Sequence, residues 1–285
     1  MTKSPVITIY RPNMRHELGF FETWAVMMRN VWGARELIWQ LFKRDFFAPY
    51  KKSFVGVAWV LIAPAAGMLS WILVQRAGLL NPGDVGVPYP VYVLIGTTIW
   101  GLFMGLVRST AKTLTAGQSL VMQVNYPHEA LLFKQSAEAL TNFLISLTLT
   151  VVVLAVFRVL PSWGVLLLPL VLLPLYFLAA AFGLIFSMLA VVAVDMTKVI
   201  EVGLGFLMFL TPVVYTPDAT KGLARHVVDW NPLTYLVCSA RDIILYGRLY
   251  NPGMYFLWAA IAVFLFLISW RLFYVSEHKL IERMI

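Results

Sequence analysis

The feature that most constrains the fold is a series of long apolar segments that carry almost no charge. Six such segments of 16 to 30 residues follow one another along the chain. A backbone inside a lipid bilayer must satisfy its own hydrogen bonds, so segments of this kind cross a membrane as helices. The predicted fold is an all-α membrane protein with six transmembrane helices, at residues 54–74, 89–107, 137–157, 165–194, 199–214 and 254–274.

Composition supports this class. Hydrophobic residues make up 60% of the chain and charged residues only 13%, whereas soluble domains have roughly 45–50% and about 25%. The net charge of +8 is attributed to Lys and Arg that orient the helices, and not to nucleic-acid binding. The single cysteine, Cys238, excludes an intrachain disulfide, and the four histidines have no metal-ligand spacing. No cleavable signal peptide is apparent.

An amphipathic, basic helix is predicted to precede the first span. It occupies residues 33–53 and follows a loosely structured extension at residues 1–32. Apolar residues such as Leu37 and Leu41 recur at helical spacing, with basic residues on the other side. Asp45 falls on the apolar side, so the regular face is expected to fray before Pro49 ends the helix. A helix of this kind is expected to lie in the membrane interface.

The distribution of Lys and Arg predicts the orientation. If both termini are cytoplasmic, 16 of the 22 basic residues lie on the cytoplasmic side and 6 on the outer side. Positive residues are enriched in cytoplasmic loops, so this arrangement is favoured. The transmembrane domain then covers residues 54–285, as a multi-pass protein with both ends in the cytoplasm.

Residues 215–251, between the fifth and sixth spans, are predicted to form short helices on the outer face. Asn231 and Pro232 are a favourable helix start, and Gly247 is a favourable stop. The enclosed helix of about fifteen residues carries Arg241 and Asp242, so it is too short and too charged to span. We expect a re-entrant or interfacial hairpin.

The sequence contains no recognisable catalytic or nucleotide-binding motif. The chain lacks GxxxxGK[ST], so it has no nucleotide-binding loop of its own, and no catalytic set lies in an apolar segment. Glu138 and Asn142, one turn apart, indicate an interhelical hydrogen bond or a substrate contact. The glycine pair Gly101 and Gly105 fits close packing within the chain or a homodimer seam.

Aromatic side chains are the candidates for a transport conduit. Most tryptophans fall where a membrane belt places them, but Trp100 lies near the middle of the second span. Helix packing and conduit lining both fit this position. Aromatic faces suit the C–H surfaces of sugars. The candidate lining residues are Trp71, Tyr92, Trp100, Phe103, Phe209 and Tyr215.

The cytoplasmic loop at residues 112–127 is unusually apolar. An exposed apolar loop favours a partner surface. The segment either lies on the membrane or docks into another subunit, and its apolar residues are Leu114, Leu120, Val121, Met122 and Val124.

Four motifs follow one another along the chain. The first comprises Arg44, Asp45, Tyr50, Lys51, Ser53, Gly56, Trp59 and Pro64. The others are Asn125-Tyr126-Pro127, Thr211-Pro212-Val213-Val214-Tyr215 and Asn231-Pro232-Leu233. In this order they resemble the ABC-2 type permeases of bacterial polysaccharide export, of the Wzm and KpsM kind, over roughly Arg35 to the C-terminus. The family's first motif is similar to RDxxxRYKxSxLGxxWxxxxP, and Pro49 here stands in place of its arginine.

The resemblance implies a function. It implies a homodimer of this chain in the bacterial inner membrane, paired with two copies of an ABC ATPase that binds ATP and Mg. The chain itself would bind no cofactor. The ATPases would contact the coupling residues, which include Tyr126 and Pro127, and lie beneath the interfacial helix. The assembly would export lipid-linked polysaccharide, and periplasmic export machinery could take part. Residues 215–251 would form an outer gate with Asn231, Pro232, Arg241 and Asp242.

Three alternatives belong to other substrates or classes. An ABC-2 exporter of teichoic acid or of a small lipid or drug shares the motifs. A membrane enzyme such as a glycosyltransferase would need paired carboxylates at a nucleotide-sugar site, and the cytoplasmic carboxylates are not arranged as one. An ion-driven carrier would need a charge near the membrane midplane, and none is evident.

Overall fold

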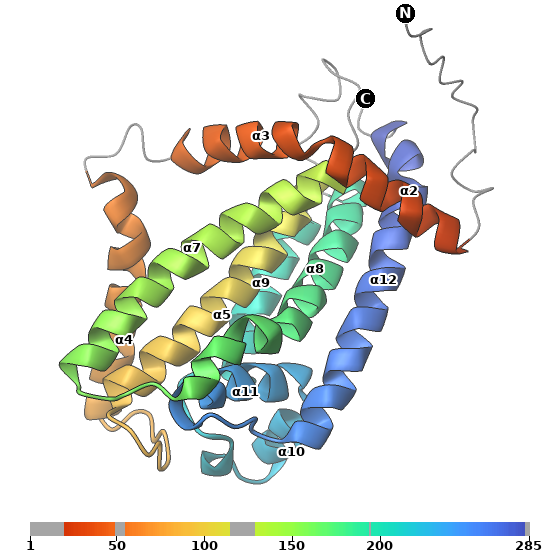
Figure 1. Ribbon diagram of the computed structural model, residues 1–285. Coiled ribbons are helices and arrows are strands. Elements are labelled where there is room, and N and C mark those ends of the chain that lie inside the picture. The colour runs from red at the N-terminus through yellow and green to blue at the C-terminus, as the bar shows by residue number, and fades with distance from the viewer. Residues whose placement is uncertain (1–19, 49–54, 115–128, 194, 283–285) are drawn as a thin grey trace, which may run out of the picture.

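The computed structural model describes residues 20–48, 55–114, 129–193 and 195–282, which form helices and turns without a strand. Long helices run side by side, and short helices lie across both ends of the bundle (Figure 1). We call these the α3 end and the α11 end. The helices are α2 (Phe20–Gly33), α3 (Arg35–Phe47), η2 (Gly56–Ala58), α4 (Trp59–Arg76), α5 (Tyr89–Ala111), α7 (Glu129–Val156), η3 (Trp163–Leu167), α8 (Leu168–Val192), α9 (Met196–Phe209), η4 (Pro217–Ala219), α10 (Leu223–Trp230), α11 (Pro232–Tyr246) and α12 (Pro252–Glu282).

Helix α5 is the centre of the bundle. It packs against α4, α7, α8 and α11, and residues such as Phe103 and Leu106 are fully buried. Helix α4 is its opposite, because none of its residues is buried. Helices in a membrane associate through close packing and hydrogen bonds, since lipid is as apolar as leucine. Helix α4 is therefore held weakly in the bundle, whereas α5 is held by neighbours on several sides.

Small residues bring α8 close to α5. A Cβ atom at Gly183 would collide with the side chain of Thr110, and it would lie 3.0 Å from the carbonyl oxygen of Val107. Ala179, one turn earlier on α8, is fully buried. This small-residue pair thus serves packing within one chain.

Five of the described helices are long and apolar enough to cross a membrane: α4, α5, α7, α8 with η3, and α12. The fifth predicted span, residues 199–214, differs from the structure. Its helix α9 has only 14 residues, and the chain then continues as irregular backbone. Helix α9 nevertheless runs from the α3 end toward the α11 end (Figure 1). The reason for its short length lies in the side chains that bind the irregular segment, described below.

The segment before the interfacial helix is more ordered than the sequence predicted. Helix α2 covers residues that were expected to be loose, and its Thr23 and Met27 are buried. The Trp24 ring meets Trp270 of α12 edge to face, with 5.2 Å between centroids. Helix α2 forms because its apolar face packs across α7 and α12.

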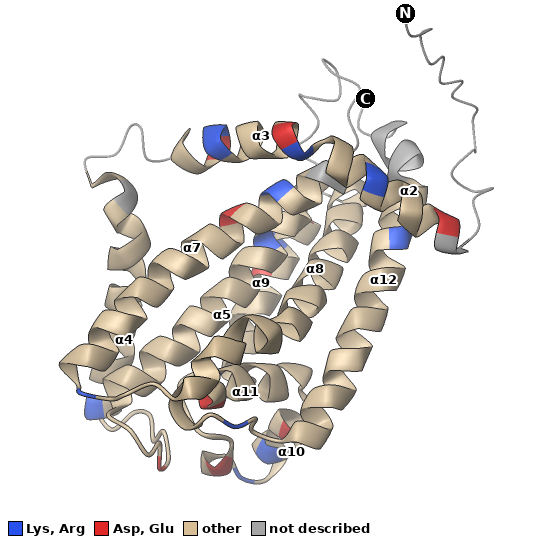
Figure 2. Ribbon diagram, in the orientation of Figure 1, with Lys and Arg blue, Asp and Glu red and all other residues tan. Residues whose placement is uncertain are grey.

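Helix α3 agrees with the predicted interfacial helix and lies across the end of α7 (Figure 1). Lys, Arg, Asp and Glu gather toward the two ends of the bundle, and its middle is nearly free of them (Figure 2). This distribution is what a membrane-spanning bundle requires, because a charged side chain at the bilayer centre is costly.

Candidate functional site

The irregular residues 210–215, after α9, are held by side chains at the α11 end. Asn231 donates from Nδ2 to the Leu210 carbonyl and to Thr211 Oγ1, both at 2.9 Å. Its Oδ1 accepts from the amide of Leu233 at 2.9 Å. Asn231 thus caps α11 and binds the irregular segment together.

Two tyrosines of α5 complete this set of contacts. Tyr89 donates its hydroxyl proton to the Val214 carbonyl at 3.2 Å, and Tyr92 donates to the Tyr215 carbonyl at 2.9 Å. A Cβ atom at Gly96 would collide with the Val213 carbonyl oxygen. Irregular backbone is tolerated at membrane depth only where the protein satisfies its polar groups. These contacts explain why α9 can end early.

Arg241 of α11 is 3% exposed. Its Nη1 donates to the Pro212 carbonyl at 3.1 Å, and its guanidinium lies 4.1 Å from the centroid of the Tyr92 ring. Asp242 lies 3.5 Å from its Nε. Two of the predicted outer-gate residues, Arg241 and Asp242, therefore lie together at a buried charge that a carbonyl, an aromatic face and a carboxylate stabilise. The other two, Asn231 and Pro232, lie at the start of α11.

The six predicted conduit residues do not form one row in a single chain. Tyr92, Trp100 and Phe103 are buried on α5, and the last two rings are 5.3 Å apart. Trp71 of α4 meets Phe209 of α9 edge to face at 6.2 Å. Phe209 is 63% exposed, and its carbonyl accepts from the Tyr215 hydroxyl at 2.8 Å. A conduit through these residues remains a prediction.

An ion-pair cluster joins α3 to α7. The Lys134 side chain is 5% exposed, and its Nζ lies 2.7 Å from Asp45 Oδ2 and 2.6 Å from Glu138 Oε1. Arg44 contacts the other oxygen of Asp45 at 2.6 Å. Burial raises the pKa of Asp45, but hydrogen bonds from Arg44 and Lys134 outweigh it and lower this pKa. The sequence predicted that α3 would fray at Asp45. Instead, Asp45 fixes the helix to α7 through Lys134.

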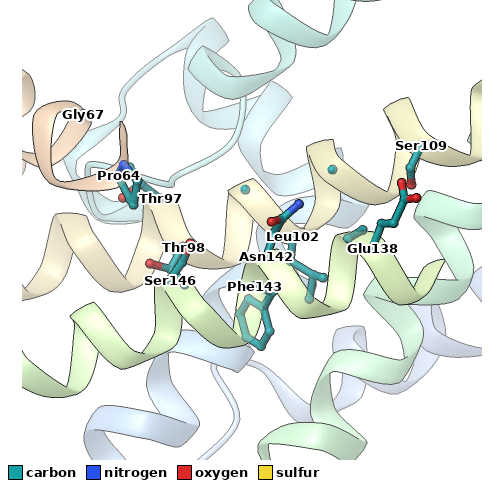
Figure 3. Close-up of a pocket in the computed structure, with 13 residues that line it drawn as sticks. Pro64, Gly67, Thr97, Thr98, Leu102, Ser109, Glu138, Asn142, Phe143 and Ser146 are labelled. Carbon is teal, nitrogen blue, oxygen red and sulfur yellow. The ribbon is translucent and has the colours of Figure 1, made fainter. Parts of the chain in front are cut away.

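A cavity of about 350 Å³ lies between α4, α5 and α7. Helix α7 contributes Glu138, Asn142 and Ser146, which follow at intervals of four residues and so share one face. Figure 3 shows the Glu138 carboxylate beside Ser109, and Thr98 beside Ser146. The full lining is Pro64, Gly67, Thr97, Thr98, Gly101, Leu102, Gly105, Ser109, Glu138, Ala139, Asn142, Phe143 and Ser146.

The described residues hold no group of three His, Cys, Asp or Glu side chains that could bind a metal ion. The cavity contains a single carboxylate, Glu138, which is paired with Lys134. Its other polar groups are hydroxyls and one amide. Such a lining suits hydrogen bonding to a passing or bound molecule.

Comparison with known proteins identifies the family. The profile of ABC-2 type transporters matches residues 36–245, which covers α3 to α11. This chain belongs to the ABC-2 type transporter family. It is a multi-pass membrane protein, and every feature described above except α2 and α12 lies within the matched region.

Several relatives are similar to this ABC-2 protein over most of its length. The O-antigen export system permease protein RfbA of Myxococcus xanthus is 25% identical, over 84% of this chain and 95% of the relative. A protein of the same name from Klebsiella pneumoniae is 22% identical, over 83% and 85%. The polysialic acid transport protein KpsM of Escherichia coli is 23% identical, over 73% and 80%.

Most coupling residues predicted for this ABC-2 protein lie outside the described residues: Leu120, Val121, Met122, Val124, Tyr126 and Pro127, as do Tyr50 and Lys51 of the interfacial motif. Leu114 is described. It is 2% exposed, and its amide donates to Ser187 Oγ of α8 at 3.2 Å. The first of the predicted coupling residues is therefore anchored in the bundle.

Three residues that the structure shows in key contacts were not predicted from the sequence: Lys134 between α3 and α7, and Tyr89 and Gly96 against the irregular segment after α9. Their partners lie far along the chain, so local patterns carry no signal for them. The lining of the cavity, in contrast, does have a signal in the sequence. Glu138, Asn142, Ser146 and Thr150 repeat every four residues on α7, and this polar stripe in an apolar span extends the Glu138 and Asn142 pair that the sequence analysis singled out.

Proposed function

We propose that this chain is the permease subunit of an ATP-driven exporter that moves lipid-linked polysaccharide, such as O-antigen or capsule, across the bacterial inner membrane. The observation that carries the proposal is the set of relatives named for O-antigen export and polysialic acid transport, which align over 73–84% of the chain. Membership of the ABC-2 family supports a separate ABC ATPase as the source of energy.

The arrangement of α4 and α9 supports assembly as a homodimer. Helix α4 has no buried residue and α9 has only Leu204. On α9, Phe206 is 68% exposed and Phe209 63%. Two helices that contribute so little to the core of one chain suit a contact with a second copy. A conduit between two copies would then be bordered by Trp71 and Phe209.

The two ends of the bundle suit different roles in export. At the α3 end, Lys134 links α3 to α7, so force from an ATPase beneath α3 and the coupling loop would reach a membrane helix directly. At the α11 end, α10 and α11 form a compact cap that suits an outer gate. The start of α2 and the end of α12 lie at the α3 end (Figure 1), which supports the proposal that both termini are cytoplasmic.

Reconstitution tests the proposal. The chain purified alone should hydrolyse no ATP, and hydrolysis should appear only with its ATPase partner in the same vesicles. In cells, deletion of the chain should leave lipid-linked polysaccharide on the cytoplasmic face, with none at the surface. ATP hydrolysis by the chain alone, or normal surface polysaccharide in the deletion strain, would contradict the proposal.

A further inference from the structure

We propose that the cavity between α4, α5 and α7 is a saccharide-binding groove, in which single sugar residues of the exported polymer hydrogen bond to Glu138, Asn142 and Ser146. The inference rests on the proposed function, because the polymer is the assumed source of the sugar. It assigns a contact surface inside one chain, separate from the aromatic residues predicted to line a conduit.

The chemistry of the lining argues for a polyhydroxylated ligand. Asn142 and Ser146 line the cavity, and the described residues give neither side chain a hydrogen-bond partner. A lipid tail in the cavity would leave these groups without partners, which is unfavourable because a polar group removed from water loses its hydrogen bonds. Sugar hydroxyls donate and accept, so they satisfy an amide, a hydroxyl and a carboxylate equally well.

The charges of the lining argue against an anion such as phosphate. Glu138 is the one charged residue of the cavity wall. The nearest described cation, Lys134, already lies within 2.7 Å of two carboxylates. A phosphate group would meet a negative charge with no free cation to balance it. A neutral ligand avoids this repulsion and can donate hydrogen bonds to Glu138.

The shape of the cavity also fits a sugar ring. Gly101 and Gly105 line the cavity, and a Cβ atom at Gly101 would meet nothing within 4 Å. Leu102 and Phe143 supply apolar surface beside the polar stripe, and a sugar presents both kinds of face. The volume of about 350 Å³ lies within the range of small-molecule sites, roughly 300–1,000 Å³.

The position of the groove fits an approach from the cytoplasmic side. Ser109 lies near the end of α5 and Glu138 near the start of α7, which are both at the α3 end, whereas Thr97, Thr98 and Ser146 lie further along these helices. Figure 3 shows the two groups apart from each other in the cavity. From Glu138 to Ser146 the stripe extends about 12 Å, at about 1.5 Å per residue. Its wall α4 has no buried residue, so this wall can move aside without opening the core.

Cysteine accessibility tests the groove. The native Cys238 is fully buried, so it should not react. Asn142→Cys is made with Leu144→Cys as the matched control, because Leu144 lies on the same helix, is 60% exposed and does not line the cavity. Inside-out vesicles with the ATPase, from cells unable to start polymer synthesis, are treated with a charged, membrane-impermeant thiosulfonate reagent. Delipidated fragments of the surface polysaccharide of the parental strain, which does make the polymer, are the added probe.

The expected result is that Asn142→Cys reacts and Leu144→Cys does not. The fragments should slow the reaction of Asn142→Cys about tenfold, the change that 1.4 kcal/mol of binding produces. Ser146→Cys serves as a second reporter if the first variant fails to assemble. Gly101→Leu, which fills the groove, should abolish protection at Ser146→Cys.

Two outcomes would overturn the inference. If neither Asn142→Cys nor Ser146→Cys reacts, lipid or protein fills the cavity. If they react at the same rate with and without fragments, the cavity holds water but no sugar. ATP-driven export of polymer by the wild-type chain in companion vesicles separates the groove from the proposed export function. Export without protection of the cysteines refutes the groove alone. Absence of export refutes the proposed function.

Discussion

Gly96 and Gly101 lie five residues apart on α5, yet their surroundings are opposite. A Cβ atom at Gly96 would collide with the carbonyl oxygen of Val213, whereas one at Gly101 would meet nothing within 4 Å. Toward the α11 end, α5 is in tight contact with irregular backbone. Toward the α3 end, the same helix borders a cavity.

The difference separates a rigid part of the molecule from an adaptable one. The residues around Gly96 are joined by side-chain hydrogen bonds from α5 and α11, so any movement of residues 210–215 breaks several at once. The residues around Gly101 include Asn142 and Ser146, whose side chains have no hydrogen bond to another described residue, and α4, which has no buried residue. Under the proposed function, the rigid part suits a gate that keeps its shape, and the adaptable part suits a space that adjusts to its cargo.

Removal of the buried cation should produce the largest effect. Arg241→Met leaves Asp242 without its nearest cation and the Pro212 carbonyl without its charged donor, so that only the weak contact from the Cys238 thiol is left. Loss of one partner from a buried pair costs about 3–5 kcal/mol. The purified protein should lose its monodisperse state at a clearly lower temperature on heating. Arg248→Met, at an exposed position of the same end, should behave as wild type; equal behaviour of the two variants would show that Arg241 is dispensable.

The two glycines can be compared directly. Gly96→Ala should destabilise by about 2–3 kcal/mol, because the added methyl forces α5 away from a backbone carbonyl that cannot rotate aside. Gly101→Ala should be neutral or stabilise by about 0.5–1 kcal/mol, since alanine is the better helix former and the space is empty. Thermal denaturation of both variants in the same detergent measures the difference. A similar change in both would refute the contrast between the two regions.

The sequence predicted the parts of this fold that depend on local chemistry. Asn231, Pro232 and Gly247 gave the start and end of α11 correctly: Asn231 caps the first turn, and Gly247 adopts the left-handed conformation with φ of 68°. Long apolar segments likewise predicted the five long helices α4, α5, α7, α8 and α12. In each case the information lies within a few neighbouring residues.

The sequence failed where a partner lies far along the chain. Asp45 looked misplaced on an apolar helix face, because its partner Lys134 is 89 residues away and nothing in the local pattern announces it. The early end of α9 is a second example. Its cause is a set of side chains from α5 and α11, and their effect on residues 210–215 appears only when the helices are packed together.

A smaller loss is expected at the α3 end, where the ion pair is partly exposed. Lys134→Met should cost about 2 kcal/mol, within the range for a hydrogen bond to a charged group. Arg108→Met, an exposed cation on α5, is the control. Because the pKa of Asp45 is lowered on folding, its contribution is present above the unfolded pKa of about 3.9. The gap between wild type and Lys134→Met should be constant near pH 7 and close as the pH falls below that value.

The smallest effect tests a single hydrogen bond of the rigid region. Tyr92→Phe removes the hydroxyl that donates to the Tyr215 carbonyl at 2.9 Å and keeps the ring beneath Arg241. The expected loss is about 1 kcal/mol. Tyr92→Leu removes both the hydrogen bond and the cation–π contact, which adds roughly 1–2 kcal/mol at a desolvated site. Thermal denaturation should therefore rank wild type, Tyr92→Phe and Tyr92→Leu in that order. If Tyr92→Phe and Tyr92→Leu are equally destabilised, the ring contributes nothing to Arg241, and the hydrogen bond to the Tyr215 carbonyl is the one stabilising contact of the Tyr92 side chain with this region.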